Sequence, residues 1–137
     1  MVQRDVLKVQ IEQLGKVLGK MLAAFLHQKS EGAVVQGMHI ANEKIKATIG
    51  IDLADFLRLP ETEWQAHCLK NNLQAEHLEI LAAYLKAAGE SKIKTNETEG
   101  KEAFLNAIRL LDMADRLTKT TSFDRINQKA AIRALCL

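Results

Sequence analysis

Large apolar residues recur at alternating steps of four and three along the start of the chain. The members of this seam are Leu7, Ile11, Leu14, Leu18, Met21 and Phe25. Such steps average about 3.5 residues, so all members share one face of an α-helix. Flanking apolar residues make the seam wider than a coiled-coil stripe, which is typical of a helix buried in a globular bundle. We therefore predict an amphipathic helix over residues 2–28.

The rest of the chain continues in residues that favour helices. It has one proline and seven glycines among 137 residues, and no apolar–polar alternation of useful length predicts a strand. Further helical segments are predicted at residues 31–49, 53–59, 60–71, 72–89, 97–119 and 123–135. The connections are short, so neighbouring long helices should be antiparallel. We expect an all-α fold of five to six helices in antiparallel hairpins, forming one domain over residues 1–137.

Several helix ends are marked by capping residues. Asp52 follows a glycine and is expected to cap the short segment after it. Asn72 is expected to cap the helix that follows it, and Asn96 with Glu99 has the spacing of a capping box. The polar stretch 90–99 is the best candidate for a loop.

Composition restricts the compartment and the class of protein. The apolar fraction is 47%, and the longest purely apolar run, residues 21–26, is far shorter than the roughly 18 residues that span a bilayer. The N-terminus does not resemble a secretory signal. Two cysteines without an export signal indicate a reducing compartment, so we expect a cytoplasmic protein. A net charge of +2 neither requires nor excludes an acidic partner.

The stretch "WQAHCLKNNLQAEH", residues 64–77, contains the strongest candidates for catalysis or metal binding. His67 and Cys68 are adjacent, so on a helix they point about 100° apart and are poorly placed to share a metal or to form a nucleophile and base. Trp64 and Cys68 are four residues apart and share a face. We expect a core Trp–Cys pair with His67 at its polar edge, and predict no metal site.

No enzyme motif accompanies this stretch. The chain has no G-x-G-x-x-G, P-loop, G-x-S-x-G or H-E-x-x-H spacing, so no cofactor is indicated. The carboxylates Asp112 and Asp115 are accounted for by i,i+4 pairs with Arg116 and Lys119 on an exposed face. We expect the protein not to be an enzyme.

The last predicted helix has a stripe of basic residues. Arg125, Lys129 and Arg133 follow one another at steps of four. Such a stripe can contact phosphates or an acidic protein surface. Cations are also favoured near a helix C-terminus, so a solvated face is the plainer interpretation.

One helical pair has features of a tetratricopeptide repeat. Residues that match aromatic and small positions of that motif are Tyr84, Gly100, Phe104 and Ala107. Positions that depart from it are held by Ala87, Ala88, Ser91 and Asp112. The resemblance implies a degenerate tetratricopeptide-like arrangement of hairpins, whose concave surfaces bind peptides or proteins.

Two segments are similar to a bacterial family of small tetratricopeptide-repeat-like all-helical proteins. The opening "VQRDVLKVQIEQLGKVLGKML" resembles the start of that family, and "ATIGIDLADFL" resembles the helix break after its second helix. The similarity is close over the first 57 residues and loose over the remainder. The family has no assigned activity, so the resemblance implies a fold.

These patterns together favour a non-catalytic protein-interaction or scaffold module. The partner is expected to be another protein or a second copy of the chain, and the candidate surface is the seam of the first helix, which a homodimer would bury symmetrically. The alternative is that other helices of the same chain cover this seam. A small nucleic-acid-binding regulator that uses the basic stripe is the second hypothesis, and an enzyme without a visible motif is the third.

Overall fold

The computed structural model describes the backbone of residues 2–27 and 31–136, and the side chains of residues 8–20 and 36–136. Over this backbone there are seven helices and no strand, which confirms the all-α prediction. The helices are α1 (Val2–His27), α2 (Glu31–Ile49), α3 (Leu53–Arg58), α4 (Glu61–Lys70), α5 (Ala75–Lys92), α6 (Glu97–Thr118) and α7 (Phe123–Leu135). The segments predicted at residues 53–59 and 60–71 are both helices, separated as expected by extended backbone at Leu59 before Pro60, so the count is seven where five or six were expected.

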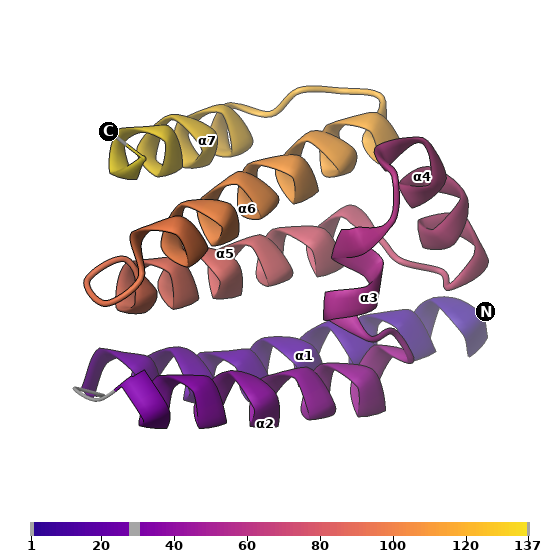
Figure 1. The fold of residues 1–137 in the computed structure, drawn as a ribbon. Helices are drawn as coiled ribbons and strands as arrows, with labels where there is room; N and C mark the ends of the chain where they lie inside the picture. Colours follow the sequence, from indigo (N-terminus) through magenta and orange to yellow (C-terminus); the bar gives the residue numbers. More distant parts are fainter. Residues whose placement is uncertain (1, 28–30, 137) are drawn as a thin grey trace.

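The long helices lie side by side in an order that differs from their order in the sequence (Figure 1). The α1–α2 pair packs through α1 on α5, α5 packs on α6, and α6 packs on α7. The short helices α3 and α4 connect α2 to α5 across one end of the molecule (Figure 1). One cluster of buried apolar residues runs through these contacts, from Leu14 in α1 to Ile132 in α7.

The contact between α5 and α6 is the most extensive in the described chain, and two glycines make it close. A Cβ atom on Gly89 would lie 2.6 Å from the Phe104 ring. A Cβ atom on Gly100 would lie 2.7 Å from the Cα atom of Ile93. Neither position has room for a side chain unless its neighbours move. The close approach of α5 and α6 therefore depends on the absence of a side chain at Gly89 and Gly100.

The predicted capping residues at two helix starts are confirmed. The Asp52 carboxylate accepts a hydrogen bond from the Asp55 N–H at 3.1 Å, and the Asn96 side chain accepts one from the Glu99 N–H at 3.1 Å. The Glu99 carboxylate does not complete a capping box, because it binds Lys92 at 2.7 Å. Helix α5 reaches Lys92, so the loop expected over residues 90–99 is shortened to residues 93–96.

The start of α5 differs from the prediction. Asn72 does not cap it; this residue lies in the turn after α4 with a φ of 57°, a left-handed conformation that Asn tolerates well. Gln74 is the N-cap, and its N–H donates to Nδ1 of His77 at 2.9 Å. The Gln74 side chain and His77 form a reciprocal capping box. The prediction missed it because histidine seldom takes the place of Glu or Gln in this motif.

Candidate functional site

The C-terminal helix α7 is held in place mainly by charged side chains. Ser122 caps it by accepting a hydrogen bond from the Arg125 N–H at 3.1 Å. The buried residues of α7 are Arg125 and Ile132. An arginine that is 5% exposed requires partners, because an unpaired buried charge is costly.

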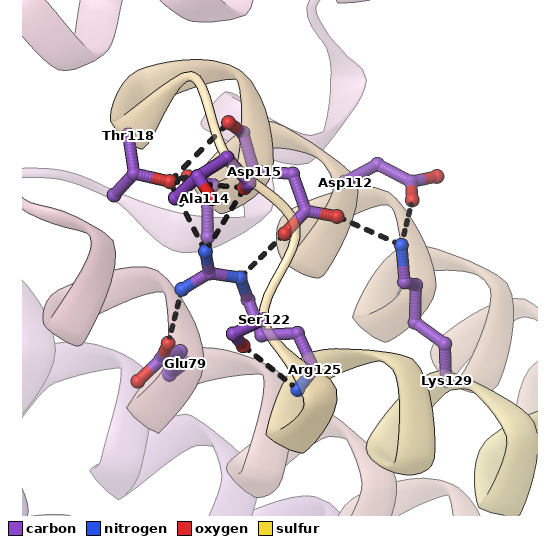
Figure 2. Close-up of polar contacts among 9 residues, drawn as sticks. Glu79, Asp112, Ala114, Asp115, Thr118, Ser122, Arg125 and Lys129 are labelled. Atoms are coloured by element: carbon purple, nitrogen blue, oxygen red, sulfur yellow. Dashed lines mark hydrogen bonds and ion pairs between the residues drawn. The ribbon is translucent and has the colours of Figure 1, made fainter.

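Arg125 finds these partners on two other helices (Figure 2). Its Nε donates to the Asp115 carboxylate of α6 at 2.5 Å, and its Nη1 donates to the Glu79 carboxylate of α5 at 2.7 Å. Its Nη2 donates to the Thr118 hydroxyl at 3.0 Å and to the Thr120 carbonyl at 3.2 Å. The hydrogen bond to Asp115 raises the pKa of Arg125 despite its burial. One guanidinium thus joins α5, α6, α7 and the connection before α7.

Lys129 extends the same network by one turn. Its Nζ contacts the carboxylates of Asp112 and Asp115, both at 2.9 Å (Figure 2). The hydrogen bond to Asp112 is the largest of the effects that raise the pKa of Lys129. Burial opposes ionisation of Asp115, but the hydrogen bonds from Lys129 and Arg125 outweigh it and hold the pKa of that carboxyl below its usual value.

The predicted basic stripe is thereby divided. Arg125 and Lys129 face inward and are paired with carboxylates, whereas Arg133 is exposed. The local pairs expected for Asp112 and Asp115 with Arg116 and Lys119 do not form, because Arg125 and Lys129 of α7 occupy both carboxylates. Only Arg133 of the three basic residues has its charge directed to solvent.

A groove of about 380 Å³ runs between α5 and α7 over α6. Its apolar lining comes from Ala82, Ala83, Leu111, Ala131 and Ile132. Its polar lining comes from Glu79, Lys86, Asn127 and Gln128. The small side chains on α5 and α7 leave this space, because alanine methyl groups do not fill the gap between two helices.

One stripe of the solvent-facing side of α7 is also apolar. The residues Phe123, Ile126, Ala130 and Ala134, called the α7 outer face below, are exposed and follow one another at steps of three, four and four. The exposed fraction of Phe123 is 83%, the highest among the large apolar residues of the described side chains. Sequence reasoning missed this face. The signal was present, since apolar residues recur at steps of three and four at these positions of the sequence.

The seam of the first helix is covered at its centre. Leu14 and Leu18 are buried within the chain, and Ile11 is half-buried. The side chains of the other three members, Leu7, Met21 and Phe25, lie outside the described residues. At its described positions the seam therefore presents no exposed leucine to a partner.

The stretch around Trp64 is core, as predicted. Trp64 and Cys68 are fully buried, and burial raises the pKa of the Cys68 thiol to about 11, which disfavours the nucleophilic thiolate. The Trp64 Nε1 donates to the Leu59 carbonyl at 3.0 Å, and the Arg109 guanidinium lies 4.3 Å from the centroid of the Trp64 ring. His67 packs edge-on to Phe56.

A second hollow of about 280 Å³ lies where α3 meets α4, lined by residues that include Asp52, Asp55, His67 and Lys70. The Asp52 carboxylate is already engaged in capping, and Asp55 contacts Arg58 at 3.7 Å. Across residues 8–20 and 36–136, no three His, Cys, Asp or Glu side chains are grouped so that they could hold a metal ion.

No helix in the described part of the chain is long and apolar enough to cross a membrane. The chain matches no protein-family model, no curated protein and no solved structure.

Proposed function

We propose that the protein is a non-catalytic interaction module whose binding surface is the α7 outer face together with the groove beside it. The observation that carries this proposal is the exposure of Phe123 and Ile126 on the outermost helix, next to an apolar-lined groove. Exposed aromatic and aliphatic residues beside a pocket are the usual anchors of protein-binding surfaces.

The dimensions of the surface favour a helical or extended peptide segment. The polar groove residues on α5, Glu79 and Lys86, are seven residues apart, which is about two helical turns or 10 Å. They carry opposite charges, but Arg125 already pairs with Glu79, so a bound segment would add an anion near Lys86. Amphipathic helices bind such grooves through anchors at steps of three and four.

We also propose that the α5–α6 hairpin is one degenerate tetratricopeptide-like unit. Such a unit would support the binding of a peptide segment. Tyr84, Phe104 and Ala107 are fully or almost fully buried, and Gly100 provides the close approach that a small residue gives in that motif. This supports the resemblance to tetratricopeptide-repeat-like proteins and the use of hairpin surfaces for binding.

Two other functions have weaker support. Nucleic-acid binding would draw on Arg125 and Lys129, which are occupied by carboxylates. Catalysis would require a reactive group at a hollow, and Cys68 is buried with a raised pKa.

The test compares two surface variants of the full chain as bait in an extract of its own source cells. The first is Phe123→Ser with Ile126→Ser, and the matched control is Leu69→Ser, which alters a side chain 65% exposed on α4. Quantitative mass spectrometry should show a protein that copurifies with the wild type and the control, and is reduced at least tenfold with the double variant. Equal recovery by all three baits contradicts the proposed surface.

A further inference from the structure

The side of α7 that faces the core contacts the other helices mainly through ion pairs. Its inner face consists of Arg125, Lys129 and Ile132, and the surface that receives it is an acidic patch formed by Glu79, Asp112 and Asp115. Four ion pairs join the two, with N–O distances from 2.5 to 2.9 Å. Ile132 is the buried apolar residue of this helix. The acidic patch therefore specifies a helix with two basic residues at a step of four.

The connection that brings α7 to this patch is short and strained. Helix α6 ends at Thr118 and α7 begins at Phe123. Lys119 ends α6 in a left-handed conformation, with a φ of 55° and a ψ of 31°, which is unfavourable for a residue with a side chain. Thr120 and Thr121 are exposed. A short strained connection before a separately docked helix favours exchange of that helix between molecules.

We propose that α7 is an exchangeable element, and that the acidic patch of one chain binds α7 of a second copy. The complementary cations and carboxylates are shown within one chain, and a second copy presents the same cations on the same helix. The contacts of α7 with α5 and α6 are preserved in the exchanged dimer, while Lys119 is released from its left-handed turn.

This inference goes beyond the proposed function, because it concerns the inner face of α7 while the proposed binding surface includes the outer face. The short connection gives α7 a high effective concentration at its own patch, so the closed monomer dominates in dilute solution. Exchange is expected when the closed form is weakened or when the chain is concentrated.

The experiment uses two full-length variants with reversed charges. Asp115→Lys leaves a normal α7 beside a repelling patch, and Arg125→Glu leaves a normal patch beside a repelling α7. Each variant alone, and each of its homodimers, places like charges together. In an exchanged dimer of one chain of each kind, the native α7 of the Asp115→Lys chain meets the native patch of the Arg125→Glu chain and regains all four ion pairs. The other α7 gains one opposite charge at position 115, although its Lys129 stays close to that position. This mixed dimer is the only arrangement in which a native α7 meets a native patch.

Light scattering after size exclusion and native mass spectrometry give the result. Each variant alone should have the mass of one chain, and an equimolar mixture at about 100 μM should show a mixed dimer with twice that mass and a higher melting temperature. A mixture that stays monomeric, or that gains no stability when the separate variants fold poorly, overturns the proposal.

A second variant tests exchange with all charges in place. Removing Thr120 and Thr121 leaves too short a connection for α7 to fold back along α6. The shortened chain should be dimeric at concentrations where the wild type is monomeric. A shortened chain that remains monomeric, with α7 amides exchanging rapidly with solvent, also overturns the proposal. Both readouts are masses, so they are independent of partner capture through Phe123.

Discussion

The α5–α6 hairpin and the α7 helix are attached to the same core in different ways. The hairpin closes through glycines that let Phe104 and Ile93 touch the opposite helix, with the ion pair between Lys92 and Glu99 beside the turn. Helix α7 is attached through Arg125 and Lys129, whose carboxylate partners lie on α5 and α6. The two regions should therefore be sensitive to different kinds of substitution. Close apolar packing responds to volume, whereas the attachment of α7 responds to charge.

The largest effect is expected from Arg125→Ala. The change leaves the half-buried Asp115 with Lys129 alone and leaves Glu79 without a partner. Breaking one side of a buried ion pair costs about 3–5 kcal/mol. Hydrogen exchange should show that α7 amides lose protection first, while the α5–α6 hairpin remains protected. Loss of protection in both regions at once would mean that the two attachments are not separable.

The control for this prediction is Arg133→Ala. It removes the same charge from the same helix, but Arg133 is exposed and has no ion-pair partner among the described residues. Its effect on the free energy of unfolding should stay within about 0.5 kcal/mol. Equal effects of the two changes would indicate that net charge, rather than the Asp115 and Glu79 contacts, attaches α7.

The next effect is expected from Gly100→Ala, which acts on the hairpin. The new methyl group would lie 2.7 Å from the Ile93 Cα atom, which belongs to the backbone and cannot rotate away. Overpacking of about 1–3 kcal/mol should exceed the gain of about 1 kcal/mol from replacing glycine in a helix. Urea unfolding measures the change. Gly19→Ala is the control: among the described atoms outside its own helix backbone and its two chain neighbours, none lies within 4 Å of the new methyl group, so it should stabilise the protein.

Cys68→Ala should have a smaller effect, and only on stability. The side chain is fully buried beside the hairpin, and its truncation should cost about 1–2 kcal/mol. The melting temperature should fall, while the interaction tested through Phe123 stays unchanged. If binding is lost while the fold is intact, Cys68 acts in function and its assignment to the core is incomplete.

The smallest effect at neutral pH is expected from the His77 cap. Burial lowers the pKa of His77 below the ordinary 6.5, although Glu76 acts in the opposite direction. The unfolded chain therefore binds a proton that the folded chain does not, so the stabilisation present above pH 6.5 is lost as the pH falls from 6.5 towards the folded pKa. Protonation of Nδ1 would also end the hydrogen bond from Gln74.

Urea unfolding at pH 7.5 and pH 5.5 tests this difference. The wild type should lose stability on acidification, and His77→Gln, which keeps a side chain suited to the capping box, should lose less. The α7 ion pairs should not contribute, because the pKa of Asp115 is lowered and its carboxylate stays ionised at both values. Equal pH dependence in the two proteins would show that His77 is not the titrating group.

Local signals were readable in the sequence, and distant pairings were not. The bounds of α2 and α7 follow the prediction, because the periodicity and the breaking residues that define a helix act within a few residues. The Glu79–Arg125 pair joins residues 46 positions apart, and nothing in the spacing predicts it. A local ion pair was expected for Asp115, but Arg125 of α7 pairs with this carboxylate instead. Buried charges are therefore the feature of this chain that single-sequence reasoning predicts least well.

The single tryptophan gives this protein a built-in optical probe. Trp64 is fully buried, stacked near Phe56 and covered by Arg109 of α6, and it lies on α4 rather than on α7. Its fluorescence should report the opening of the α4–α6 junction and remain silent when α7 alone detaches. Release of α7 can then be separated from global unfolding in one cuvette, as a loss of helical circular dichroism that precedes any shift in emission.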